Sequence, residues 1–249
     1  MQREYMTNVM WKKMLEFLRR EKSIYVGQEY ECRKFINAIF WIARTGAQWR
    51  ELPQHYGVWN SVYQRFNRWS RKGVWGNLLT FCAQDADMEY AIFDSTIVRA
   101  HACSAGYKAQ ANEGLGRSKG GFTSKIHVLV DGLGNLLKHI IAPGQSSDFT
   151  YAVELIKGIE DAYAIGDRGY DSNNIRTAIA SQNCIPVIPC RSNRKAQYEY
   201  DRHIYKERSL VEFFFSKAKH FRRVFSRYDK TICNFASFVS FVGVILWLR

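Results

Sequence analysis

The 249-residue sequence lacks the motif spacings of several common classes of protein. Its six cysteines are far apart and contain no C-x-x-C pair, which argues against a zinc site or a disulfide framework and indicates reduced thiols. The sequence contains neither G-x-G-x-x-G nor G-x-x-x-x-G-K, so a nucleotide-cradling loop is not expected. Internal repeats and low-complexity stretches are also absent from the sequence.

Long apolar runs are missing as well. The apolar segment FASFVSFVGVILWL near the C-terminus has only 14 residues, which is too short to span a bilayer and predicts a buried helix. The first 22 residues carry too many charges for a signal peptide. We therefore expect a cytoplasmic protein that has no membrane partner.

Acidic residues are scarce, with 23 Asp and Glu against 36 Lys and Arg. The resulting net charge of +13 is distributed unevenly: residues 1–89 carry +5, residues 90–180 are neutral and residues 181–249 carry +8. Two basic flanks around a neutral middle favour nucleic acid as the partner. A general contribution of charge to solubility would produce the same excess without any partner.

The first 80-odd residues have helical periodicity. An apolar face is formed by Phe35, Ile36, Ile39, Phe40 and Ala43, and Gly46 is expected to end that helix. The segment WNSVYQRFNRWSRKG predicts a second helix, which is capped at Asn60 or Ser61 and ended by Gly73. Its basic residues are Arg65, Arg68, Arg71 and Lys72.

These two helices, with the turn ELPQHYG between them, are similar to a helix-turn-helix, whose second helix can enter a DNA major groove. We therefore expect residues 1–87 to be a helical DNA-binding region. The four basic residues of its second predicted helix are expected to contact DNA. An ordinary helical bundle with a basic surface is the alternative.

From Met88 onward the pattern changes to short strands and helices. Strands are expected at 90–94, in a hairpin over 124–142, near 163–167 and at 184–190, with helices at 148–160, 173–183 and 205–219. Three successive strands followed by a helix-strand-helix-strand passage predict one mixed α/β sheet covered by helices. The glycine-rich EGLGRSKGGF is expected to be a flexible basic loop.

Two aspartates directly follow short predicted strands. Asp94 comes after YAIF and Asp167 after YAIG, where each strand leaves the sheet and where open α/β sheets place their ligand sites. Taken alone, such an aspartate is more often a cap or a turn former. Asp171 is expected to cap the helix that follows it, and Asp148 is expected to cap or to precede its helix.

A third carboxylate, Glu212, lies on the predicted helix 205–219. At about 100° per residue, an arc of roughly 60° holds Tyr205, Arg208, Glu212 and Lys219, opposite an apolar face. A solvated outer face of a helix would have the same pattern. As part of a site, Arg208 and Lys219 would neutralise DNA phosphates, and Tyr205 could donate to a phosphate or stack on a base.

Three carboxylates from separate segments are the kind of oxygen ligands that hard cations such as Mg²⁺ prefer. Two such ions about 4 Å apart could activate an attacking oxygen and stabilise the leaving oxygen at phosphorus. Arg168, beside the second aspartate, is a candidate phosphate contact, and His101 is expected to be structural or to contact a phosphate rather than to act as a base.

The arrangement of these motifs resembles a known family. The spacing Y-(2)-R-(3)-E-(6)-K, which is typical of bacterial insertion-sequence transposases, is formed by Tyr205, Arg208, Glu212 and Lys219. The segments DSTIVRAH around Asp94 and GDRGYDS around Asp167 resemble the other two acidic motifs of that DDE group. The N-terminal TGAQWRELPQHYGVWNSVYQRFNRW is similar to the family's helical DNA-binding region. The resemblance extends from about Cys32 to Lys230.

This resemblance implies a ribonuclease-H-like catalytic domain over residues 88–249. In it, Asp94, Asp167 and Glu212 are expected to bind Mg²⁺, with Mn²⁺ as a substitute. The enzyme is expected to hydrolyse phosphodiesters at the terminal inverted repeats of its own element, and the freed 3′ hydroxyl then attacks target DNA. A homodimer or larger assembly, associated with the bacterial nucleoid, is implied as well.

Three alternatives stay open at this point. A metal-dependent nuclease of the same fold would cut DNA without joining it. A basic DNA-binding regulator would carry its acidic residues incidentally, and an RNA-processing enzyme would prefer RNA to duplex DNA.

Overall fold

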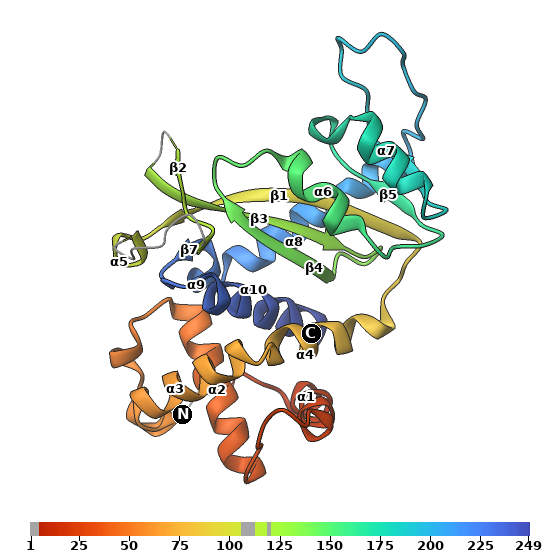
Figure 1. Cartoon of the computed structure of the whole chain (residues 1–249). Coiled ribbons are helices and arrows are strands. Elements are labelled where there is room, and N and C mark those ends of the chain that lie inside the picture. The colour runs from red at the N-terminus through yellow and green to blue at the C-terminus, as the bar shows by residue number, and fades with distance from the viewer. Residues whose placement is uncertain (1–4, 106–112, 119–120) are drawn as a thin grey trace. The chain divides into compact units, whose positions relative to one another are not determined.

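A computed structural model describes residues 5–105, 113–118 and 121–249 of the chain (Figure 1). The chain divides into two compact units. The helical unit contains Met1–Cys82, Ala100–Lys108 and Ala218–Arg249, and the sheet unit contains Ala83–Arg99 and Ala109–Lys217.

The helical unit begins with four helices, as the periodicity of the sequence predicts. They are α1 (Asn8–Arg20), α2 (Glu29–Thr45), α3 (Trp59–Arg71) and α4 (Val74–Cys82). Gly46 ends α2 with a left-handed φ of 68°, which confirms the predicted stop and favours glycine. The cap of α3 predicted at Asn60 or Ser61 is wrong by two or three residues. The observed N-cap residue is Val58, which makes no side-chain hydrogen bond to the first turn.

The connection between α2 and α3 is longer than a simple turn. It contains the short 3₁₀ helices η1 (Trp49–Glu51) and η2 (Gln54–Tyr56), whereas the two helices of a helix-turn-helix are joined by three or four residues. The helical N-terminal region is confirmed, and its resemblance to a helix-turn-helix stays a prediction.

The rest of the helical unit comes from later parts of the chain. It consists of α5 (Ala102–Ala105), α9 (Arg222–Phe225), β7 (Ser226–Arg227) and α10 (Ile232–Trp247). On α10, Phe238 stacks on Phe66 of α3 at a ring-centroid distance of 4.5 Å, and Phe241 meets Trp75 of α4 edge-on at 5.3 Å. Burial of this aromatic face explains why the C-terminal segment joins the helical unit instead of the catalytic domain expected over residues 88–249.

The buried C-terminal helix itself was predicted from its apolar sequence, and α10 is largely buried. Among the described residues, none of the helices combines the length and the apolar character needed to cross a membrane.

Among its described residues, the sheet unit contains six strands, which are β1 (Tyr90–Ala100), β2 (Gly116–Ser118), β3 (Gly121–Val130), β4 (Leu136–Pro143), β5 (Tyr163–Ile165) and β6 (Ile185–Val187). Three α-helices, α6 (Asp148–Ile156), α7 (Asn173–Ala180) and α8 (Ser209–Lys219), accompany them. Short 3₁₀ helices occur at η3 (Ala83–Asp85), η5 (Arg168–Tyr170) and η6 (Ile204–Arg208).

The topology is that of a mixed sheet. β3 pairs antiparallel with β1 and β4, while β5 pairs parallel with β1 and β6, which gives the order β4-β3-β1-β5-β6. The predicted ribonuclease-H-like α/β fold is therefore confirmed. The glycine-rich segment expected to be a loop instead forms β2 and begins β3, because these strands pair antiparallel; Lys119 and Gly120 lie outside the described residues.

A hydrophobic core lies on the face of the sheet that carries α6 and α7 (Figure 1). It includes Phe93 of β1, together with Leu155 of α6 and Ile175 of α7. Because side chains alternate along a strand, Asp94 points to the opposite face of β1. The N-terminal end of α8 lies on that opposite face, since Arg208 immediately before α8 contacts Asp94.

Candidate active site

The parallel pairing of β1 and β5 aligns the two predicted catalytic aspartates. Ile92 of β1 pairs with Ile165 of β5, so continuing this register by two residues sets Asp94 opposite Asp167. Asp167 follows the end of β5, as predicted. Asp94 follows the buried residues 91–93 but lies inside β1, so the prediction that its strand leaves the sheet there is wrong, because pairing with β3 continues to Arg99. The register therefore points both side chains to the same face of the sheet.

Gly166 makes this alignment possible. A Cβ atom built at Gly166 would lie 2.5 Å from the ring of Phe93 on the neighbouring strand, a distance that real side chains do not reach. The turn that follows is fixed locally, because Asp167 Oδ1 accepts a 2.7 Å hydrogen bond from the Gly169 amide and caps η5. A small residue before Asp167 thus lets the second strand end beside the first.

Arg208 connects Asp94 with Glu212. Its Nη1 donates to Asp94 Oδ2 at 3.1 Å and its Nη2 contacts Glu212 Oε1. The predicted continuous helix 205–219 is wrong in its first turn, because residues 204–208 form the 3₁₀ helix η6 and α8 begins only at Ser209. The four motif residues therefore do not share one regular helical face, although Arg208 and Glu212 still meet.

The environment of Asp94 opposes its ionisation. Burial of the side chain is the main reason that the pKa of Asp94 is raised to about 6, and the neighbouring carboxylates of Asp167 and Asp148 raise this pKa further. The Ser95 amide, 2.7 Å from Asp94 Oδ1, and the Arg208 guanidinium act in the opposite direction. A carboxyl group with a raised pKa beside other carboxylates is typical of a functional site.

The donor chemistry fits a hard divalent cation, because carboxylate oxygens are the ligands that Mg²⁺ and Mn²⁺ prefer. Within the part of the chain that the structure describes, however, no three His, Cys, Asp or Glu side chains are close enough together to hold a metal ion. Arg208 contacts both Asp94 and Glu212. Gathering the three predicted ligands around an ion would require this guanidinium to leave that position.

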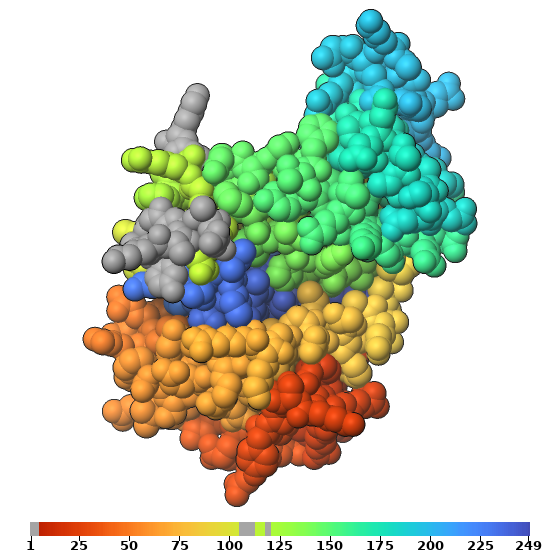
Figure 2. All heavy atoms as spheres, viewed as in Figure 1, coloured from red at the N-terminus to blue at the C-terminus, as the bar shows by residue number. Residues whose placement is uncertain are grey.

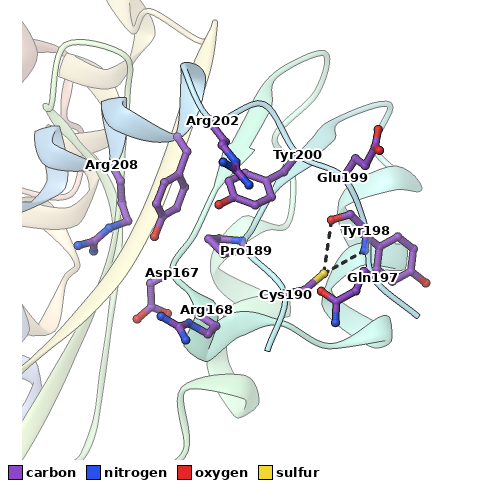
Figure 3. Close-up of a pocket in the computed structure, with 11 residues that line it drawn as sticks. Asp167, Arg168, Pro189, Cys190, Gln197, Tyr198, Glu199, Tyr200, Arg202 and Arg208 are labelled. Atoms are coloured by element: carbon purple, nitrogen blue, oxygen red, sulfur yellow. Dashed lines mark hydrogen bonds between the residues drawn. The ribbon is translucent and has the colours of Figure 1, made fainter. Parts of the chain in front are cut away.

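A cavity of about 850 Å³ opens beside Asp167. Its lining is basic and aromatic as well as acidic, and consists of Asp167, Arg168, Pro189, Cys190, Gln197, Tyr198, Glu199, Tyr200, Arg202, Tyr205 and Arg208. Figure 3 shows Asp167, Arg168 and Arg208 on one side of the cavity and Cys190, Gln197 and Tyr198 on the other. Three predicted DNA-contacting residues, Tyr205, Arg208 and Arg168, thus line one cavity with a predicted catalytic aspartate.

Asp148 neither caps nor precedes α6, the two possibilities expected from the sequence. It is the first residue of that helix, and its Oδ1 accepts hydrogen bonds from Ser95 Oγ at 2.7 Å and from Lys125 Nζ at 3.1 Å. The buried His127 ring approaches the same oxygen to 3.7 Å. Asp148 therefore binds α6 to two strands of the sheet, in a polar cluster on the face opposite Asp94.

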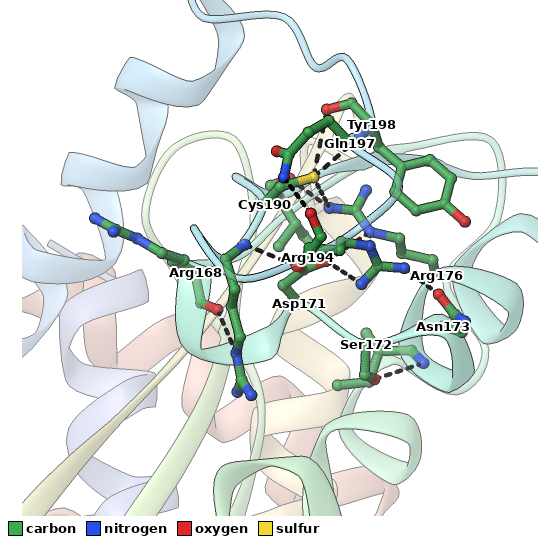
Figure 4. Close-up of polar contacts among 12 residues, drawn as sticks. Arg168, Asp171, Ser172, Asn173, Arg176, Cys190, Arg194, Gln197 and Tyr198 are labelled. Carbon is green, nitrogen blue, oxygen red and sulfur yellow. Dashed lines mark hydrogen bonds and ion pairs between the residues drawn. The ribbon is translucent and has the colours of Figure 1, made fainter.

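Asp171 does not cap α7 either, because Ser172 Oγ accepts from the Ile175 amide in that role. The Asp171 carboxylate instead accepts hydrogen bonds from Arg176 Nε at 3.0 Å, Arg194 Nη1 at 2.9 Å and the Arg191 amide at 2.9 Å (Figure 4). Arg194 is 23 residues away in the sequence. No local spacing signal could have found this contact.

The remaining predicted DNA contacts lie in the helical unit. Arg65 is engaged in packing, because its guanidinium carbon lies 4.4 Å from the Phe35 ring centroid and its Nη2 donates to the Val26 carbonyl at 3.0 Å. Arg68 and Arg71 are exposed on α3, and Lys72 at the end of α3 donates to the Ser23 carbonyl.

Two further candidates from the sequence also belong to the helical unit. Lys219 is the exposed last residue of α8, and its Nζ lies 5.3 Å from the Phe225 ring centroid. His101 contacts the Tyr228 ring at a centroid distance of 5.1 Å and its Nδ1 lies 3.1 Å from Cys103 Sγ. These contacts suit the structural role considered for His101.

The sequence is similar to known transposase families and proteins. A family model described as "Transposase DDE domain" matches residues 85–237, which is more than half of the chain. The chain belongs to this DDE transposase family. A second model, described as "Putative transposase of IS4/5 family", matches residues 6–79. The two matches cover the helical N-terminal region and the sheet unit of this transposase.

Individual relatives of this DDE transposase are bacterial. One is the "Putative transposase for insertion sequence element IS6501" of Brucella ovis, 34% identical over 129 residues that span 51% of this chain and 99% of the relative. Another is "Uncharacterized protein y4sN" of Sinorhizobium fredii, 40% identical over 95 residues that span 38% of this chain and 70% of the relative.

Among solved structures, the piggyBac transposase synaptic complex with hairpin DNA aligns with 77% of this chain and 50% of its own chain. The sequence identity is 13% and the TM-score is 0.41, a likeness too low to carry any argument about the site.

Proposed function

We propose that this DDE transposase cleaves phosphodiester bonds at the ends of its insertion element and joins the freed 3′ hydroxyl to target DNA by transesterification. The observation that carries the proposal is the β1–β5 register, which aligns Asp94 with Asp167 at the carboxyl end of β5. Arg208 connects Glu212 to the same aspartate from the start of α8. Three carboxylates from distant segments thus belong to one neighbourhood.

Proteins of the DDE domain family generally use divalent metal ions, and we propose that Asp94, Asp167 and Glu212 hold Mg²⁺, with Mn²⁺ as a substitute. Such ions supply Lewis-acid activation of the attacking oxygen and neutralise charge at the phosphorus. The raised pKa of Asp94 supports this assignment, because a nearby cation would stabilise the carboxylate form that burial and the neighbouring aspartates oppose.

The cations of the site have a role that complements the carboxylates. Arg208 and Arg168 line the cavity beside Asp167 and are suited to bind the phosphates of a DNA strand that enters it. When Arg208 engages a phosphate, its hold on Asp94 and Glu212 is released. Tyr205, which lines the same cavity, offers a hydroxyl donor or an aromatic surface to the strand.

Double-stranded DNA is the proposed partner, in the form of terminal inverted repeats of the element and a target duplex. The exposed Arg68 and Arg71 of α3 and Lys219 of α8 are proposed to bind DNA phosphates. A homodimer or larger assembly on paired ends is proposed as the working form, because joining both ends of an element requires two sites.

A strand-transfer assay tests the proposal. The full chain is incubated with labelled element-end duplex, target plasmid and Mg²⁺ or Mn²⁺, and products are separated on denaturing gels. We expect nicked ends first and then joined product, neither of which forms in EDTA. Cutting without joining would instead indicate a nuclease of the same fold, binding without cutting a regulator, and a preference for RNA an RNA-processing enzyme.

A further inference from the structure

A long segment without helix or strand separates β6 from η6. We call residues 189–203 the strap. It projects beyond α7 (Figures 1 and 2), and segments of this length without regular structure are uncommon in compact domains unless they serve a function. Seven residues of the strap line the cavity beside Asp167, and Arg202 near the end of the strap is one of them. The strap therefore forms one wall of the candidate active site.

The strap is held by a buried carboxylate. The Asp171 side chain is 1% exposed and accepts from Arg176, from Arg194 and from the backbone of Arg191, the last two of which belong to the strap. Burial alone would raise the pKa of Asp171, but the Arg191 amide and the two arginine side chains outweigh it and lower this pKa. These three donors thus compensate the negative charge of the buried Asp171 carboxylate.

An aromatic ring completes this anchor. The guanidinium carbons of Arg176 and Arg194 lie 4.7 Å and 4.6 Å from the centroid of the Tyr198 ring. The Tyr198 amide lies 3.1 Å from Cys190 Sγ, so the beginning and the middle of the strap meet. We call Asp171, Arg176, Arg194 and Tyr198 the Asp171 cluster (Figure 4).

The same anchor reaches the turn that carries Asp167. Arg191 Nη2 donates to the Gly169 carbonyl at 2.8 Å and its Nε approaches the Arg168 carbonyl at 3.5 Å. Figure 4 shows the Arg168 side chain pointing away from the Asp171 cluster. The strap is therefore fixed to the backbone of η5 while the Arg168 side chain is left to line the cavity.

Such a network is an unusual way to attach a surface segment. Burying a carboxylate with two guanidinium groups contributes little net stability compared with apolar packing, and its best-supported use is to select one conformation among several. Here the selected conformation presents Gln197, Tyr200 and Arg202 to the cavity beside Asp167. Aromatic and cationic groups along one wall are suited to a single strand of nucleic acid.

We propose that the Asp171 cluster is a positioning device that holds the strap as a wall for the DNA strand entering the cavity beside Asp167. This inference rests on the proposed function, since it assigns the strap to the same DNA substrate. The four residues of the cluster act through the strap and do not contact the reacting phosphate. Loss of the anchor should therefore weaken binding of the DNA end and leave the chemical step largely intact.

Arg194→Gln tests the proposal, with Lys195→Gln as the matched control. Both variants remove one positive charge from the strap, but only Arg194 contacts Asp171 and Tyr198. Three quantities are measured on the full-length chain: amide hydrogen exchange of residues 189–203, the Kd for an element-end duplex, and kcat for end cleavage. Arg194→Lys, which keeps the charge but loses the planar guanidinium fork, is the second variant in case the first does not fold.

In Arg194→Gln we expect the strap amides to exchange at least about tenfold faster, Kd to rise about tenfold and kcat to change less than about twofold. Arg194→Lys should shift strap exchange and Kd in the same directions by smaller factors. Lys195→Gln should leave strap exchange as in the wild type. The proposal is overturned if strap exchange is unchanged in the folded variants, if Kd is unchanged while exchange accelerates, or if Lys195→Gln raises Kd as much. A wild-type chain that binds DNA ends but neither cuts nor joins them overturns the proposed function instead, and the exchange and Kd results still decide the role of the strap.

Discussion

Asp167 and Asp171 are four residues apart, yet they belong to two regions in which the pKa of a buried aspartate is shifted in opposite directions. At the acidic edge, formed by Asp94, Asp167 and Glu212, burial and like charges raise the pKa of Asp94 to about 6. In the Asp171 cluster, two arginines and a backbone amide lower the pKa of a buried carboxyl group. Asp94 in the first region is therefore costly to ionise and is suited to bind a cation or to do chemistry. The second stabilises its own charge and is suited to hold structure.

The largest expected effect is on catalysis at the acidic edge. Asp94→Asn, Asp167→Asn and Glu212→Gln should each lower the rate of end cleavage at least about 10³-fold, because losing a metal ligand removes several kcal/mol of transition-state stabilisation. Single-turnover cleavage of labelled element ends measures this. Asp161→Asn is the matched control, since Asp161 lies before the opposite end of β5; a variant of the acidic edge that cuts as fast as this control would remove the residue from the site.

The next effect is on stability in the Asp171 cluster. Asp171→Asn leaves the guanidinium of Arg176, which is 8% exposed, without its ionised partner, so the free energy of unfolding should fall by about 3 kcal/mol. Urea denaturation followed by circular dichroism measures the change. Asp94→Asn should show no comparable loss at the same pH, and an equal loss in both variants would contradict the contrast between the regions.

The two regions should also differ in how stability depends on pH. The folded-state pKa of Asp94, about 6, lies above the ordinary value of 3.8, so ionised Asp94 opposes folding at pH 7 and this cost disappears below about pH 4. In EDTA, Asp94→Asn should therefore raise the unfolding free energy by about 2 kcal/mol at pH 7.5 and leave it unchanged at pH 4.

For Asp171 the sign is reversed. Its folded-state pKa is lowered, so its contribution to stability is present above the ordinary pKa of an aspartate and is lost as the pH falls through the folded-state value. The effect of Asp171→Asn in denaturation experiments should accordingly shrink toward acid pH. An effect that grows on acidification would show that the carboxylate is not held in its charged form.

The smallest expected effect concerns cations outside both regions. Lys219→Ala and Arg68→Ala should each weaken DNA binding modestly and lower the slope of log Kd against log salt by roughly one unit. Arg65→Ala should instead lower thermal stability, because its guanidinium packs on Phe35 and Trp69. Fluorescence anisotropy at several salt concentrations separates these cases, and an unchanged slope would place Lys219 or Arg68 outside the DNA path.

Much of the sheet unit could be predicted from short-range patterns. Alternating and continuous apolar runs predict the strands that contain or precede Asp94 and Asp167, because strand formation depends on residues close in sequence. The predicted end of the first strand at Asp94 is wrong, since pairing with β3 extends β1 to Ala100. The end of a helix at a glycine could also be predicted from the sequence, as Gly46 at the end of α2 shows. The first turn of the helix before Glu212 was predicted wrongly, since a 3₁₀ turn and an α-helical turn differ by tertiary contacts and not by composition.

The chain sequence by itself determined which segments become strands and helices, that Asp167 follows the end of a strand, and which family the motifs resemble. Only the tertiary structure decided which charges meet: Arg208 reaches Asp94 across 114 positions, and Arg194 reaches Asp171 across 23. The tertiary structure also decided that α10 packs in the helical unit, through aromatic contacts such as Phe238 on Phe66. The physical reason is that backbone conformation follows local sterics and hydrogen bonding, whereas the partner of a charged or aromatic side chain is set by how distant segments pack.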